Sequence, residues 1–425
     1  MATIIKAGFG KGIIHFPESM FPIEGFQGIH DAPNVRLMVL EFGRESIAIL
    51  AAELVIIPCS SIDNWKKMIS DAFFIPLSKV VVQMTHAITT PHEPGPMGPP
   101  DRRPEPTPED LRKRALYHKA TDEAVRAAIA ETRKSRQTAT FGWGNALCDV
   151  NVNCDIETPF GWWIGVNEHT LANHKMSILR VNDLQGQILG LLVSYGMKPA
   201  AIDNSGKKEG IRQISSEVAG AFCRKLEEKY HVPALYCVSA GGNQVPQKSA
   251  LKSIISEAGE IQEMDEGVAQ GFLYAEEQAE QMAQVGISIV DTIICAENAS
   301  TVGWEQTDMT WQRKKGGPRR PMREMSCIPE KEIELTADLF AMGNTVFVFV
   351  RPEMTVEAEE ILLKKSPFAQ TILMTLTNGE MKCLPDQSAY DRATYEAQGS
   401  NLMPGAAESL IDRIVSKLLL MKQES

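Results

Sequence analysis

Six side chains that could do chemistry stand just past apolar stretches of the sequence, each close to a proline. They supply carboxylate, imidazole, ammonium, amide and thiol groups, and they are Glu53, His86, Lys198, Asn243, Glu353 and Cys383. Imidazole, carboxylate and thiolate groups bind zinc-type metals, whereas a base beside an ammonium can assist attack on a carbonyl group. The set therefore indicates an enzyme site, provided that the fold brings these positions together.

The elements around these residues recur three times in the same order. Two apolar strands, a helix and a third strand follow one another in segments 36–91, 177–246 and 332–385. Short continuous apolar runs are typical of buried strands, and loops at strand ends carry function on a rigid scaffold. We therefore expect an α/β fold of mixed β-sheets with helices on their outer faces. Its repeated units of hairpin, helix and strand would deliver all six side chains to one place.

Composition restricts the partners and the compartment. The chain of 425 residues carries a formal charge of -11, which disfavours nucleic acid or an anionic membrane surface as a partner. No stretch approaches the roughly 18 apolar residues of a membrane span, and the N-terminus lacks a secretion signal. We expect a soluble, cytoplasmic protein with a small-molecule substrate, and a homo-oligomer is left open. The eight cysteines form no CxxC pair, which predicts reduced thiols in that compartment.

The segments between the units differ in character. The proline-rich passage 91–108 cannot form helix or sheet, because proline fixes φ and lacks an N–H donor. A helix is predicted over 108–136 with Thr107 as its cap, and another over 260–284. GFGKG at 8–12 indicates a strand turn rather than a phosphate loop. The basic run 313–323 indicates a solvated loop, and the steering of an anion to the mouth of a site is the alternative.

Three motifs add a resemblance. MTHAITTP (84–91), SAGGNQVP (239–246) and LTNGEMKCLP (376–385) occur in this order along the chain. They resemble A-T-H-T-H-S-G-P, G-D-x-S/N-P and S/T-N-G-x-x-G-Y-x-P of the neutral/alkaline non-lysosomal ceramidase family. The chain is similar to a divergent bacterial relative of the catalytic N-terminal domain of that family. The resemblance implies one ceramidase-like α/β domain over 1–425, without the C-terminal immunoglobulin-like domain of secreted ceramidases.

The resemblance also implies a zinc site, from which this sequence departs. The four ligand positions of the family fall on His86, Lys198, Glu353 and Cys383, so two of the four ligands survive. The second histidine of T-H-T-H falls on Ile88, and the nucleophile and its neighbouring acid fall on Val245 and Asn243. A charged ammonium at 198 cannot bind a metal and would repel one.

Two interpretations of the altered site remain open at this stage. In the first, the charge of Lys198 fills the place of the zinc and partners Glu353, since a buried carboxylate without a partner costs several kcal/mol. In the second, a metal site is rebuilt from other imidazole, carboxylate and thiol groups, drawn from His92, Glu93, His169, His174 and Cys383. The cofactor is thus either zinc or none.

The leading function is an enzyme that hydrolyses an amide or related carbonyl bond in a small polar, anionic metabolite. The candidate catalytic residues are Lys198, Glu53, Asn243 and Cys383; the candidate substrate-binding residues are His92, His174, Asn378 and Glu380; the candidate metal ligands are His86, Glu353 and Cys383. One alternative is an isomerase, racemase or lyase in which burial lowers the pKa of Lys198. Another is a binding protein that kept the pocket without catalysis.

Overall fold

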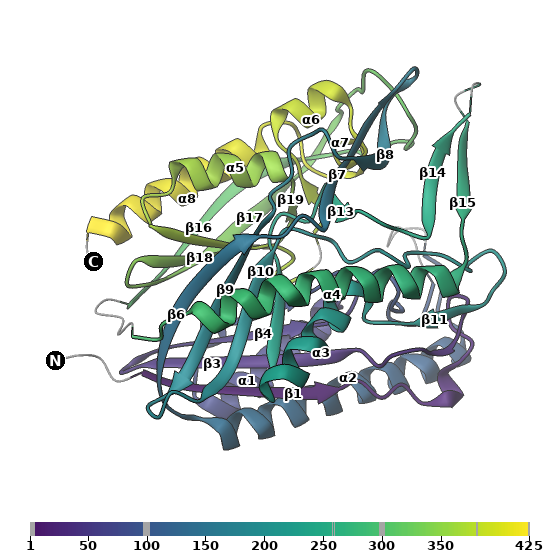
Figure 1. The fold of residues 1–425 in the computed structure, drawn as a ribbon. Helices are drawn as coiled ribbons and strands as arrows, with labels where there is room; N and C mark the ends of the chain where they lie inside the picture. The colour runs from purple at the N-terminus through teal and green to yellow at the C-terminus, as the bar shows by residue number, and fades with distance from the viewer. Residues whose placement is uncertain are drawn as a thin grey trace.

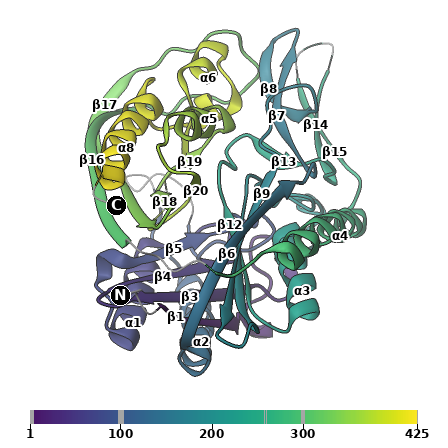
Figure 2. The ribbon, with the colours of Figure 1, turned by 60° about the vertical axis from the view of Figure 1, so that its left-hand side comes forward.

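The protein is built in four layers, with two sheets in the middle and helices outside (Figures 1 and 2). The computed structural model describes residues 5–96, 103–256, 258, 260–296, 302–379 and 381–423. The larger sheet has the order β12-β10-β9-β6-β1-β3-β4-β5. Its strands are β12 (Ala234–Val238), β10 (Ile188–Tyr195), β9 (Lys175–Asp183), β6 (Gln137–Leu147), β1 (Ile5–Ile13), β3 (Asn34–Phe42), β4 (Glu45–Ala52) and β5 (Val80–Met84).

The smaller main sheet has the order β16-β17-β18-β20 and faces the larger one. Its strands are β16 (Val302–Lys314), β17 (Pro329–Met342), β18 (Thr345–Val350) and β20 (Gln370–Met374). Alternation along each strand sends one set of side chains between the sheets and the other toward the helices. In β18, Phe347 and Phe349 join the core between the sheets, whereas Val346 and Val348 face the outer helices.

Within the described residues, six helices of ten or more residues cover the outer faces of the two sheets. They are α1 (Cys59–Phe73), α2 (Pro108–Ser135), α3 (Glu217–Tyr230), α4 (Val268–Thr292), α5 (Val356–Lys365) and α8 (Ala406–Gln423). The first four pack on the eight-stranded sheet, and α5 and α8 pack on the four-stranded sheet. Buried residues recur along α2 at spacings of three and four, from Tyr117 to Thr132, which is the pattern of a helix with one apolar face.

The predicted repeat is present three times. β3-β4-α1-β5, β9-β10-α3-β12 and β17-β18-α5-β20 each contain an antiparallel hairpin, a helix and a third strand. In all three units the third strand pairs parallel to the second. The expected α/β fold of mixed sheets with outer helices is thus confirmed.

Short elements project from the ends of the main sheets. β2 (Phe26–Ile29) pairs with β11 (Arg212–Ile214), and β7 (Asn151–Thr158) pairs with both β13 (Gln244–Pro246) and β8 (Gly161–Asn167). β14 (Leu251–Ile255) and β15 (Ile261–Asp265) form a hairpin, and β19 (Glu353–Met354) pairs with β21 (Cys383–Leu384). The other short elements are the helices α6 (Gln387–Arg392) and α7 (Tyr395–Gly399) and the 3-10 turns Glu18–Met20 and Leu77–Lys79. Figure 1 shows β14 and β15 standing beside β7 and β8.

Three local expectations are corrected. GFGKG lies inside β1 rather than at a turn, because Gly8, Gly10 and Gly12 allow the backbone of α2 to approach the strand. A Cβ at Gly10 would lie 2.2 Å from the Ala128 carbonyl oxygen. The helix expected over 260–284 instead begins at Val268 and ends at Thr292, since residues 261–265 pair with β14. The basic run 313–323 begins inside β16.

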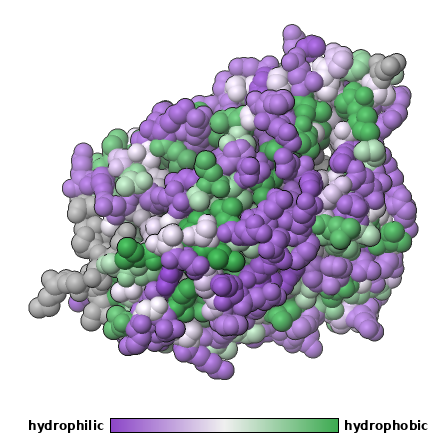
Figure 3. Space-filling model, viewed as in Figure 1, coloured by the Kyte–Doolittle hydropathy of each residue, from purple (hydrophilic) through white to green (hydrophobic). Residues whose placement is uncertain are grey.

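The helix predicted over 108–136 is confirmed as α2, and Thr107 caps it in a capping box with Asp110. Residues 97–102 of the expected proline-rich loop lie outside the described residues. Within the described part of the chain, no helix is long and apolar enough to cross a membrane. The face shown in Figure 3 carries mostly hydrophilic residues with smaller hydrophobic areas between them.

Candidate functional site

A cavity of about 880 Å³ opens beside the short sheets. Its walls come from β8, from the hairpin β14 and β15, and from the loop that follows β10. Apolar and aromatic side chains on the walls include Ile88, Ile156, Trp163, Val245 and Tyr395. The ammonium-bearing side chains are Lys198, Lys207, Lys208 and Lys252, and the acidic ones are Asp203, Glu263 and Asp265. A cavity of this size and mixed lining fits a small molecule.

Glu353 is the centre of a buried polar cluster at the ends of the repeated units. His86 Nδ1 lies 2.9 Å from Glu353 Oε1. Glu353 and Cys383 face each other in register on β19 and β21, and the Cys383 thiol donates to Glu353 Oε2 over 3.9 Å. His86 holds a left-handed backbone with φ of 60°, an uncommon state for a non-glycine residue. Such strain occurs where surrounding structure enforces a functional geometry.

The charge state of Glu353 follows from these neighbours. Burial raises the pKa of the carboxyl, but His86, Lys198 and the Cys383 thiol favour the charged form more, so the pKa falls to about 2. An ionised carboxylate can only accept hydrogen bonds, so Nδ1 of His86 carries the hydrogen and donates it in the bond to Glu353. The other ring nitrogen, Nε2, carries the lone pair when the imidazole is neutral.

Lys198 remains an ammonium. Burial opposes its charge, but the nearby Glu353, Cys154, Cys383 and Glu396 raise its pKa above the ordinary value. This finding corrects the alternative in which burial lowers the pKa of Lys198. The expectation that Lys198 is the direct partner of Glu353 is also corrected. His86 contacts the carboxylate, whereas no ion pair within the described residues includes the Lys198 ammonium.

The four positions that correspond to the zinc ligands do not fit that metal. Lys198 is charged, and His86 Nδ1 is engaged with Glu353. An ammonium in one of the four ligand positions has no lone pair for a metal, and it repels a cation placed among the other three. These four positions therefore do not supply a zinc-binding set of donors.

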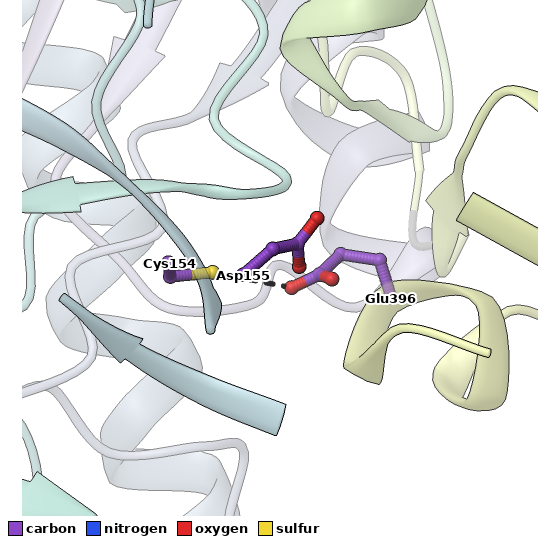
Figure 4. Close-up of side chains that lie close together, drawn as sticks. All are labelled: Cys154, Asp155 and Glu396. Atoms are coloured by element: carbon purple, nitrogen blue, oxygen red, sulfur yellow. Dashed lines mark hydrogen bonds between the residues drawn. The ribbon is translucent and has the colours of Figure 1, made fainter. Parts of the chain in front are cut away.

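A second polar cluster was missed by the sequence analysis. Cys154 and Asp155 of β7 and Glu396 of α7 point toward one another (Figure 4). Burial and the charge of Glu396 raise the pKa of Asp155 to about 9, and burial also raises the pKa of Cys154. The adjacent Cys and Asp in NVNCDIE were a usable signal, but simple strand alternation places neighbours on opposite faces.

Two candidate catalytic residues have structural partners instead. Glu53 is buried in an ion pair with Arg36 and accepts from the Asn34 backbone N–H at 2.7 Å. It therefore lies in the packing of β3 against α3 rather than in the cavity lining. Asn243 accepts from the Val356 N–H at 2.9 Å and donates to Glu357, so its side chain binds the first turn of α5.

The candidate substrate-binding residues are dispersed. His92 pairs with Glu24, His174 contacts Asn151, and Asn378 accepts from the Val82 N–H. None of these three is part of the described cavity lining. Glu380 lies outside the described residues.

Glu217 is a further buried residue that the sequence analysis did not single out. Its carboxylate accepts N–H bonds from Ala201, Ile202 and Asp203 at 2.9 to 3.2 Å. The Thr89 hydroxyl donates to the same carboxylate. These bonds hold the loop that runs from Lys198 along the cavity. A lone glutamate at the start of a helix gives no sequence signal of such a role.

No family model and no curated protein matches the chain. Solved structures do. A ceramidase complexed with C2 superposes with a TM-score of 0.72 at 11% identity, over 99% of this chain and 76% of that one. Neutral ceramidase from Pseudomonas aeruginosa gives a TM-score of 0.69 at 12% identity, over 100% of this chain and 75% of that one. The chain therefore has the fold of the neutral ceramidases.

Proposed function

We propose that the protein hydrolyses an amide or related carbonyl bond in a small polar, anionic metabolite. The observation that carries the proposal is the contact of 2.9 Å between His86 and Glu353 near the charged Lys198. The ceramidase-like fold supports a hydrolase-like reaction class, although fold alone does not define a reaction.

His86 is proposed as the general base. Glu353 orients the ring by accepting the hydrogen bond that Nδ1–H donates, and it stabilises the imidazolium that forms when Nε2 takes a proton from water. The water oxygen bonds to the substrate carbonyl carbon, and the carbonyl electron pair moves to oxygen. When the tetrahedral intermediate collapses, the bond to nitrogen breaks and the imidazolium returns its proton to the leaving amine.

Lys198 is proposed to stabilise the developing oxyanion. A fixed positive charge beside that oxygen lowers the barrier without forming a covalent bond. In this proposal the ammonium supplies part of the electrostatic role that the family assigns to zinc. Its raised pKa favours this role over proton abstraction, which requires a neutral amine.

The cavity supports the substrate class. Lys207 lies on the lining, and no ion pair in the described part of the chain includes its ammonium, so it is available to a substrate carboxylate. Trp163 and Tyr395, which meet edge to face at 5.3 Å between centroids, offer an apolar wall. An amide with an anionic group and a modest apolar group matches both features.

The test is hydrolysis of a substrate panel by purified variants. The panel contains N-acyl amino acids, neutral N-alkyl amides with the same acyl chains, and a short-chain ceramide. We expect amine release from the anionic amides. His86→Gln should lower kcat/KM by about 10²–10⁴-fold and Lys198→Met by about 10²–10³-fold.

The matched control is His169→Gln, because His169 is an exposed histidine outside the cluster. Its kcat/KM should equal that of the parent. Turnover that survives both the His86 and Lys198 substitutions would contradict the assignment of roles. Tight binding of the panel without turnover would identify a binding protein, and solvent-proton exchange without amine release would identify an isomerase.

A further inference from the structure

Cys154, Asp155 and Glu396 form a compact donor set from two distant segments. One ligand atom from each lies within 4.8 Å of the other two, and the Cys154 thiol lies 3.4 Å from Glu396 Oε1. Two ligands at zinc-type bond lengths and a tetrahedral angle are about 3.5 Å apart. The spacing therefore suits a single ion between the three side chains.

An irregularity in β7 makes this convergence possible. The register of β7 against β8 shifts between Asn153 and Asp155, as in a β-bulge. A bulge breaks the alternation of side chains and re-aims one of them. The consecutive residues Cys154 and Asp155 can thus both face Glu396, as Figure 4 shows.

Three of the four carboxylate oxygens of the set lack a hydrogen-bond donor within the described residues. Asp155 and Glu396 are each 1% exposed. Within the described residues, neither oxygen of Asp155 accepts a hydrogen bond, nor does Oε2 of Glu396. Arg392 Nη1 lies 3.5 Å from Asp155 Oδ2 and supplies only a longer ionic contact. Buried oxygens that face one another without donors are expected to have a cation or proton between them.

We propose that Cys154, Asp155 and Glu396 bind a divalent cation of the zinc type. Thiolate and carboxylate together suit zinc better than calcium or magnesium, which take oxygen ligands alone. Three anionic ligands around a divalent ion leave one negative charge, and Arg392 and Lys198 are the nearby cations that balance it. The site is distinct from the four positions that the ceramidase resemblance assigns to zinc.

The ion ties β7 to α7. These two segments carry the cavity residues Ile156 and Tyr395, each next to a proposed ligand in the sequence. Metal binding is therefore expected to stabilise this wall of the cavity, independently of the reaction at His86.

Cobalt is the probe for the test, because a cysteine thiolate gives Co²⁺ an intense near-ultraviolet charge-transfer band. Protein stripped with a strong chelator is titrated with Co²⁺ and then with Zn²⁺. We expect one equivalent of Co²⁺ to bind with that band and Zn²⁺ to displace it. Cys154→Ser should abolish the band, whereas Cys148→Ser, at a buried cysteine outside the set, should keep it.

Asp155→Asn provides a second variant, since it keeps the shape of the side chain and removes the carboxylate ligand. It should weaken Zn²⁺ binding by more than the roughly 10–100-fold typical of an outer-shell change. Folded wild-type protein that binds no Co²⁺ through thiolate would overturn the proposal and leave a proton shared by Asp155 and Glu396. A band that persists in Cys154→Ser would overturn it as well.

Discussion

His86 Nδ1 and Glu353 Oε1 lie 2.9 Å apart although the two residues are 267 positions apart in the sequence. Their contact joins the loop after β5 in the first repeated unit to β19, which follows β18 in the third. Cys383 approaches the same carboxylate from the end of that third unit. The repeat thus positions the cluster, because equivalent strand ends of different units place different side chains close together.

Glu353→Gln should change how stability depends on pH. The folded-state pKa of Glu353 is about 2, below the ordinary 4.5, so its contribution is present above pH 4.5 and is lost as pH falls toward 2. The shift corresponds to about 3 kcal/mol. Urea unfolding of the parent should show the free energy of unfolding falling as pH is lowered from 4.5 toward 2. In Glu353→Gln the free energy of unfolding should depend less on pH over this range. Glu332→Gln, at an exposed carboxylate, is the control. Equal slopes of the unfolding free energy against pH in all three proteins would refute the lowered pKa of Glu353.

Glu53→Gln should destabilise the fold without altering catalysis. Arg36 is 2% exposed and contacts both Glu53 and Glu227, so removing the Glu53 charge leaves a buried guanidinium less compensated. The expected loss in free energy of unfolding is about 3 to 5 kcal/mol. The kcat/KM of the folded fraction should match that of the parent. A selective loss of activity with unchanged stability would return Glu53 to the list of candidate bases.

The sequence predicted the site residues whose positions follow from the repeated units. It did not predict which partners from elsewhere in the chain contact them. His86 and Glu353 were found because apolar strands end shortly before them, and Cys383 because it closes the third repeated unit. Glu53 follows the same rule, yet Arg36 on the neighbouring strand captures its carboxylate. No strand-end rule distinguishes the two cases, since the difference lies in which cation the fold brings within reach.

The second cluster was missed for a different reason. A period of two assigns Cys154 and Asp155 to opposite faces of β7, and only the shifted register reverses that assignment. Gly241 shows a similar limit. A Cβ there would lie 3.2 Å from Glu353 Oε1, so glycine makes room for the carboxylate. The motif SAGGNQVP revealed the glycine but not what it accommodates.

Glu217→Ala should loosen the loop beside the cavity. Three backbone N–H groups, at Ala201, Ile202 and Asp203, would lose their acceptor, at a cost of about 1 kcal/mol each. Hydrogen exchange of these amides should accelerate, with a total loss near 3 kcal/mol in unfolding free energy. Glu209→Ala, at an exposed position in the same loop region, should leave exchange unchanged. Undisturbed protection in Glu217→Ala would show that the loop is held by other contacts.

Lys198→His should create a zinc site where the parent has none. The substitution removes the ammonium that repels a cation and adds an imidazole to His86 and Glu353, giving two nitrogen donors and one carboxylate. The experiment belongs in a Cys154→Ser, Asp155→Asn background, so that the proposed thiolate site does not contribute. Equilibrium dialysis followed by elemental analysis should find about one zinc per chain in the triple variant and none in the double variant. Equal zinc content in the two proteins would show that the charge of Lys198 is not what excludes the metal.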